Sequence, residues 1–188
     1  MRVVSGIYKG RRFDVPHSFK ARPTTDFAKE NLFNILSNLI DFENQVQALD
    51  LFAGTGSISL ELISRGCEQV VSIEKDRDHY TFICKVLKEL GNHSCLPLKA
   101  DVFKYISRCT QQFDLIFADP PYALPNLAAL PDLIIDNQLL KENGLFILEH
   151  GKDYQFEQHP NFMQHRSYGA VNFSFFTPTI KAVETSVG

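Results

Sequence analysis

An apolar stretch of the chain ends in four residues that could take part in a reaction, Asp119-Pro120-Pro121-Tyr122. They follow FDLIFA (113–118), a run that predicts a buried strand. Two consecutive prolines remove two backbone donors and fix φ at both positions, so the chain can neither extend a sheet nor begin a helix there. The elbow therefore presents a carboxylate, a free carbonyl oxygen and an aromatic ring at the end of a strand.

A glycine-rich loop follows an earlier apolar run. VQALDLF (46–52) leads into AGTG (53–56) and then into a predicted helix. Glycines let a ligand approach the backbone closely, and the first amides of the helix point toward it. We expect Asp50 to orient this loop. The dinucleotide fingerprint G-x-G-x-x-G is incomplete, because its third glycine position is Ser59.

Two further acids stand at or near predicted strand ends. Glu74 closes VVSIE (70–74), twenty residues beyond Gly54, and Asp101 follows SCLPLKA (94–100). Ligands of parallel sheets bind at the carboxyl ends of strands, where an acid can accept both ribose hydroxyls of a nucleoside. Each acid alone could be a helix cap, and each glycine an ordinary turn. Their occurrence at successive strand ends favours a nucleoside site, with Asp101 in reach of an adenine amine.

The elements that position these residues alternate between strand and helix. Apolar strands separated by amphipathic helices predict a parallel sheet covered on both faces. The expected fold class is α/β, a doubly wound, mostly parallel Rossmann-like sheet that ends in an antiparallel hairpin within 162–177, with a short N-terminal β-hairpin and helix extension. Pro97 predicts that the third strand lies at an edge or contains a bulge. The expected helices are 26–40, 57–65, 77–90, 102–109 and 127–140, and the last parallel strand is 144–150.

The whole chain of 188 residues predicts one domain, a basic extension (1–25) on a core (26–188). Residues 1–22 carry six basic side chains against Asp14 alone, a charge of +5, whereas the chain carries −3. This asymmetry predicts attraction to phosphate at one place, or else a solvated face. The four cysteines are scattered, no metal-ligand spacing occurs, and no apolar window approaches a membrane span. We expect a reduced, cytoplasmic protein without a metal.

The order of these motifs resembles a known class. The glycine loop, Glu74, Asp101 and D-P-P-Y are similar to the class I S-adenosylmethionine-dependent methyltransferases that act on planar amino groups. RPTTDFAKENLFNIL (22–36), RVVSGIYKGRRFDVP (2–16) and EHG (149–151) resemble one branch, the bacterial 16S ribosomal RNA guanine-N2 methyltransferases of the small-subunit methyltransferase D type. The resemblance covers nearly the whole chain. The glycine loop is weakly specific, and D-P-P-Y is strongly specific for amino methylation.

The resemblance implies an activity and a role for each residue. It implies methyl transfer from S-adenosylmethionine to the N2 amine of a guanine in 16S rRNA, within a 30S subunit or an assembly intermediate, by a protein that we expect to be a monomer. The catalytic residues would be Asp119, Pro120, Pro121 and Tyr122. The cofactor would be held by Asp50, Phe52, Ala53, Gly54, Gly56, Glu74, Asp101 and Thr25. RNA would be bound by Lys9, Arg11, Arg12 and Arg22.

Three alternatives remain open at the level of sequence. The same elbow serves adenine-N6, cytosine-N4 and protein glutamine methylation, although a DNA enzyme usually needs a target-recognition domain, for which this chain has no room. An NAD(P)-linked oxidoreductase would use the glycine loop but would not need Tyr122. A non-catalytic RNA-binding module would have no need of intact Gly54, Gly56, Glu74 and D-P-P-Y. The residues also leave open whether Asp119 takes a proton as a general base.

Overall fold

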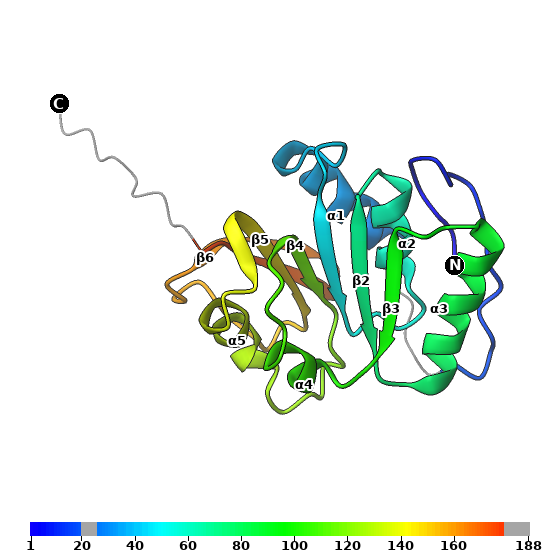
Figure 1. Ribbon diagram of the computed structural model, residues 1–188. Helices are drawn as coiled ribbons and strands as arrows, with labels where there is room; N and C mark the ends of the chain where they lie inside the picture. The colour runs from blue at the N-terminus through cyan, green and yellow to red at the C-terminus, as the bar shows by residue number, and fades with distance from the viewer. Residues whose placement is uncertain (20–25, 179–188) are drawn as a thin grey trace.

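A computed structural model describes residues 1–19 and 26–178, and its centre is one seven-stranded sheet (Figure 1). The strand order is β3-β2-β1-β4-β5-β7-β6. Strands β1 to β5 run parallel, and β7 runs antiparallel to both of its neighbours, which confirms the predicted fold class. The elements are α1 (Asp26–Leu39), β1 (Gln47–Leu51), α2 (Ser57–Ser64), β2 (Gln69–Glu74), α3 (Arg77–Leu90), β3 (Cys95–Lys99), α4 (Val102–Ile106), β4 (Phe113–Ala118), η1 (Leu127–Ala129), α5 (Leu130–Asp136), β5 (Leu140–His150), β6 (Phe162–Tyr168) and β7 (Val171–Phe176).

Two apolar layers cover the two faces of the sheet. Helices α1, α2 and α3 pack on one face, where Phe33 and Phe173 are fully buried. Helices α4 and α5, with the 3₁₀ turn η1, pack on the other face around Phe146. Because successive strand residues point to opposite faces, strands buried on both sides read as continuous apolar runs. The edge position of β3, expected from Pro97, is confirmed.

The N-terminal segment is a hairpin-like arm that rests on α2. The two halves of this arm are joined by a single antiparallel bridge between Arg2 and Arg12, whereas the predicted hairpin would have two paired strands. The backbone amides of Val4 and Ser5 donate to the Glu61 carboxylate at 2.8 and 2.9 Å. Further along the arm, two more amides donate to the hydroxyl and carbonyl oxygens of Ser64. The arm is therefore attached to the helix that follows the glycine loop.

Two predicted helices end earlier than the sequence indicates. The helix expected at 127–140 is a 3₁₀ turn followed by α5, which ends at Asp136, and Leu140 already belongs to β5. Gln138 adopts a left-handed φ of 53°, a conformation that a helix cannot continue through. The helix expected at 102–109 ends at Ile106. The end of α5 cannot be predicted from local periodicity, because it is decided by the pairing of Leu140 with Phe113 of β4, a strand distant in the sequence.

Candidate active site

Three of the predicted site acids lie at the ends of three adjacent strands. Asp50 lies in β1, Glu74 ends β2, and Asp119 follows β4. The Asp119 amide donates to the Leu51 carbonyl at 3.4 Å, so the elbow leaves the sheet beside the glycine loop. The negative charges of Asp119 and Glu74 both act on Asp50, which places the three carboxylates in one electrostatic environment. The structure thus brings the two strongest sequence motifs together at one edge of the sheet.

The glycine loop is held in shape by Glu74. The Glu74 carboxylate, nearly buried, accepts the Gly54 amide through Oε2 and the Asp76 amide through Oε1, each at 2.7 Å. Gly54 and Gly56 have φ values of 55° and 76°, in the left-handed region that favours glycine. A Cβ on Gly56 would also lie 3.0 Å from the side chain of Ile83. The loop is therefore a preformed cradle with its backbone close to the acid.

Asp50 supports the loop from inside the protein. Its carboxylate is fully buried and accepts hydrogen bonds from the backbone amide and the hydroxyl of Ser59, and that hydroxyl also contacts Ser72. Burial raises the pKa of Asp50 to about 7, and the charges of Asp119 and Glu74 add to this effect. Sequence reasoning treated Ser59 only as a missing glycine. The sequence feature that could have indicated its role is a hydroxyl side chain at a helix position that faces the core.

The elbow is fixed by the end of β5. The Tyr122 hydroxyl donates to the buried Glu149 carboxylate at 3.2 Å. A Cβ on Gly151 would lie 3.5 Å from the Tyr122 ring, so the ring lies against a backbone without a side chain. The Leu124 amide closes a turn by donating to the Pro121 carbonyl at 2.8 Å. The EHG run, noted in the sequence only as a family feature, thus positions the aromatic ring of the elbow.

Phe52 and Asp101 lie on the α4 side of the glycine loop. Phe52 has a φ of 60°, rare for an aromatic residue, and its ring contacts Phe103 edge-on at 6.4 Å. Asp101 caps α4 by accepting the Lys104 amide, and its salt bridge with Lys75 at 3.1 Å holds the pKa of the carboxyl below its usual range. The cap that sequence reasoning kept as an alternative is therefore present. A role for Asp101 in cofactor binding stays a prediction.

The predicted RNA-binding residues of the arm are exposed. Lys9, Arg11 and Arg12 all lie on the surface of the arm. The Arg11 guanidinium is partly engaged, because it pairs with Glu89 at 3.2 Å. Arg22 and Thr25, predicted to bind RNA and cofactor, lie outside the described residues.

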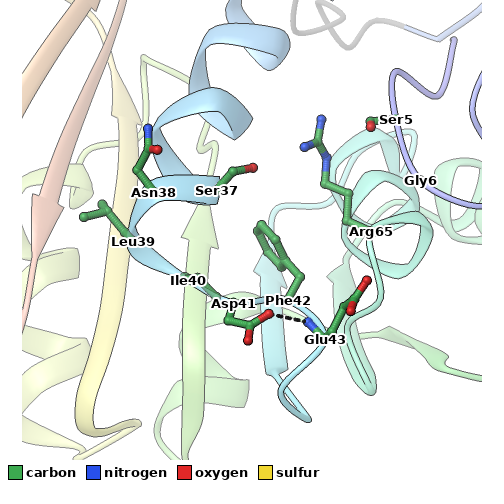
Figure 2. A pocket seen from close by; sticks show the side chains of 10 residues that line it. All are labelled: Ser5, Gly6, Ser37, Asn38, Leu39, Ile40, Asp41, Phe42, Glu43 and Arg65. Atoms are coloured by element: carbon green, nitrogen blue, oxygen red, sulfur yellow. Dashed lines mark hydrogen bonds between the residues drawn. The ribbon is translucent and has the colours of Figure 1, made fainter.

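A cavity lies elsewhere, where the chain leaves α1 and leads toward β1 (Figure 2). It measures about 580 Å³ and is lined by the end of α1, the segment 40–43 that leads toward β1, and Arg65. The Arg65 guanidinium is already bound by Glu61 at 2.9 Å and lies over the Phe33 ring at 4.5 Å. None of the predicted site residues lines this cavity, so it adds nothing to the site.

Neither a metal centre nor a membrane span is present in the described part of the chain. Within residues 1–19 and 26–178, no three His, Cys, Asp or Glu side chains gather in a way that could hold a metal ion. Among the helices of these residues, none has the length and apolar character needed to cross a membrane.

The fold and the site are those of a class I methyltransferase, a class of enzymes that use S-adenosylmethionine. The candidate methyltransferase yhhF of Escherichia coli superposes with a TM-score of 0.82 at 27% identity, over 94% of this chain and 97% of that one. The Thermus thermophilus 16S rRNA N2-guanine methyltransferase RsmC, solved with AdoMet and guanosine, shares the fold at a TM-score of 0.67 and 21% identity, over 86% of this chain and 45% of that one.

The family follows from similarity over most of the chain. The profile of the family described as Conserved hypothetical protein 95 matches residues 1–177. The ribosomal RNA small subunit methyltransferase D of Haemophilus influenzae is 33% identical over 160 residues, covering 81% of this chain and 80% of that protein. The protein of the same name from Escherichia coli K12 is 32% identical over 149 residues, covering 79% and 74%. The chain belongs to this family and is a methyltransferase of the small-subunit methyltransferase D type.

Proposed function

We propose that this protein methylates the exocyclic N2 amine of a guanine in 16S rRNA of the small ribosomal subunit. The observation that carries the proposal is the elbow Asp119–Tyr122, anchored to β1 through the Leu51 carbonyl and to β5 through Glu149, directly beside the glycine loop. The names of the relatives support an rRNA substrate, and the RsmC structure with guanosine supports guanine as the base. The protein would act in the cytoplasm and would be a monomer.

The residues at the carboxyl edge fit the cofactor. S-adenosylmethionine, when bound, supplies an electrophilic methyl group on a sulfonium. Each carboxylate oxygen of Glu74 accepts one backbone amide, from Gly54 or from Asp76, and keeps a second lone pair that can accept from a ribose hydroxyl. One wall of the site would be formed by the backbone of Phe52, Ala53, Gly54 and Gly56. Asp50 would support the loop from the interior, and Asp101 would lie at its border. Thr25 would also contact the cofactor, as the family resemblance implies. The carboxylates of Glu74 and Asp119 favour a cationic ligand.

The elbow would orient the amine rather than activate it covalently. The lone pair of a guanine amine is delocalised into the ring, so the group is a poor nucleophile and its position decides the rate. The Asp119 carboxylate and the Pro120 carbonyl would accept its two N–H bonds and direct the lone pair toward the methyl group. The same two oxygens stabilise positive charge that develops on the nitrogen. Pro120 and Pro121 hold this geometry rigid, and the proton leaves to Asp119 or to water.

Tyr122 would stack on the guanine removed from its helix. Tyr122 is 39% exposed, and its hydroxyl is held by Glu149, so part of the residue is accessible to a base from solvent. Stacking of a base on an aromatic ring is worth about 1–3 kcal/mol. Lys9, Arg11, Arg12 and Arg22 would contact RNA phosphates, which position the substrate without reading its sequence.

Methyl transfer to 30S particles that lack small-subunit rRNA methylation tests the proposal. With radiolabelled S-adenosylmethionine, label should appear in N2-methylguanosine after digestion of the rRNA to nucleosides. Asp119→Ala should lower kcat by about 100-fold or more, the loss typical of removing a group that stabilises transition-state charge. Asp136→Ala, which removes an exposed acid at the end of α5, before β5 begins, is the matched control and should keep full activity.

Two results would contradict the proposal in different ways. Label in another nucleoside would keep the amino-methylation chemistry but change the base. Cofactor binding without transfer to 30S particles or free 16S rRNA would remove the rRNA substrate altogether.

A further inference from the structure

A second aromatic surface lies two strands away from β5, to which the elbow is anchored, and has no part in holding the cofactor loop. Phe27, in the first turn of α1, is 66% exposed, more than the Tyr122 ring. Its ring meets the ring of Tyr168, at the end of β6, edge-on with centroids 6.3 Å apart. Phe27 is the one exposed phenylalanine in the described part of the chain, since all the others are buried or partly buried. An exposed ring held against a second ring offers a flat apolar surface on which a base can stack.

The strand register connects this surface to the elbow. The Tyr122 hydroxyl donates to Glu149, and Glu149 lies directly opposite Phe173 of β7. Residues directly opposite on antiparallel strands point to the same face. Phe173 contacts the Tyr168 ring at 6.2 Å, and Tyr168 contacts Phe27. A continuous row of side chains on the α1 face of the sheet therefore runs from the elbow to the exposed ring.

A cation borders the same surface. Arg166 lies two residues before Tyr168 in β6 and opposite Phe173, so its side chain points to the α1 face. It is exposed, its guanidinium donates to the His165 carbonyl at 2.9 Å, and it enters no salt bridge with any residue of 1–19 or 26–178. A guanidinium beside aromatic rings matches a nucleotide, which offers a flat base and a phosphate.

The size of the surface favours a nucleotide over a protein partner. Two rings, with the charged residues Asp26 and Glu30 nearby in α1, offer far less apolar area than the roughly 800 Å² per partner of a stable protein interface. One base covers a ring of this size completely.

We propose that Phe27 and Tyr168 form a second stacking site, which takes an unpaired base of the RNA near the methylated nucleotide while Arg166 faces its phosphate. This proposal rests on the proposed function, because it takes the substrate to be RNA. The elbow would hold the target base, and the second site would hold the neighbouring strand in an opened conformation.

The test compares binding of 16S rRNA, by filter retention, for the wild type and four variants. Phe27→Ala should raise the Kd roughly 5- to 150-fold, the range for loss of one stacked base, and Phe27→Trp should restore it. Leu39→Ala, an exposed apolar residue at the other end of α1, is the matched control and should bind as the wild type does. Arg166→Gln should reduce the slope of log Kd against log salt by about 1, whereas Phe27→Ala should leave that slope unchanged.

Each outcome separates this proposal from the proposed function. A Phe27→Ala variant whose Kd for 16S rRNA stays within twofold of the wild type overturns the stacking site. A defect on 30S particles without a defect on naked rRNA would point to contact with a ribosomal protein and would also overturn it. If the wild type binds rRNA but transfers no methyl group, the proposed function fails, and the Kd comparison still decides the stacking site. If the wild type binds neither 16S rRNA nor 30S particles, both fail.

Discussion

The Asp50 carboxyl group makes stability depend on pH. Because burial raises its pKa from 3.8 to about 7, the folded protein binds a proton here more tightly than the unfolded chain does. Its contribution to stability is complete below pH 4 and is lost as the pH rises from about 4 to 7. A shift of this size corresponds to a loss on the order of 4 kcal/mol.

The Asp50→Asn variant tests this dependence. Asparagine keeps an oxygen that can accept from Ser59 but does not ionise, so the free energy of unfolding of the variant should lack this pH-dependent loss. Urea unfolding between pH 5 and 8 should therefore show the variant gaining stability relative to the wild type as the pH rises. Asp153→Asn, at an exposed acid, should keep the wild-type slope. Parallel curves for wild type and Asp50→Asn would show that Asp50 is already ionised at pH 5.

At the scale of elements, docking of the N-terminal arm on α2 depends on Gly6. A Cβ on Gly6 would lie 1.7 Å from the Ser64 carbonyl oxygen, and its φ of 79° is left-handed. Gly10 has a similar φ of 83°, but a Cβ there would meet nothing within 4 Å. Substitution of Gly10 therefore tests backbone strain alone, whereas substitution of Gly6 tests strain together with a steric clash.

We expect Gly6→Ala to undock the arm, whereas Gly10→Ala should cost only the left-handed strain, about 1–2 kcal/mol. Hydrogen exchange should detect the difference, because the Ser5 and Tyr8 amides are protected by Glu61 and Ser64 in the docked arm. These amides should exchange rapidly in Gly6→Ala and remain protected in Gly10→Ala. Equal protection in both variants would show that the arm can adjust to the added methyl group.

At the scale of the whole molecule, positive charge is concentrated in the N-terminal segment. The chain carries −3 overall, yet its first 22 residues carry +5. Lys9 and Arg12 are exposed on the arm, whereas Lys141 is engaged by Asp114 at 2.7 Å. Non-specific attraction to RNA should therefore come from the arm and weaken with salt.

This distribution predicts the salt dependence of rRNA binding. Lys9→Gln and Arg12→Gln should each reduce the slope of log Kd against log salt by about 1, the effect of one lost phosphate contact. Lys141→Gln should leave the slope unchanged, since its charge is already paired. An unchanged slope in both arm variants would place the RNA path away from the arm.

The local features of this site could be predicted from the sequence. The elbow, the glycine loop and Glu74 each follow from a few neighbouring residues, and the alternation of apolar strands and helices predicts the strand ends at one edge of the sheet. The arm and the antiparallel end of the sheet were predicted in the same way. Helix ends were less accurate, as at Gln138, because pairing with a distant strand overrides local periodicity.

Only the tertiary structure decided which distant residues support these motifs. Glu149 holds Tyr122, Glu61 and Ser64 hold the arm, and Phe27 meets Tyr168, although no local pattern links these partners. Their contacts depend on strand order and register, which place the ends of β4, β5 and β6 within reach of one another. The types and spacing of neighbouring residues determined the chemistry of the site, and the packing of segments far apart in the chain determined what holds it in place.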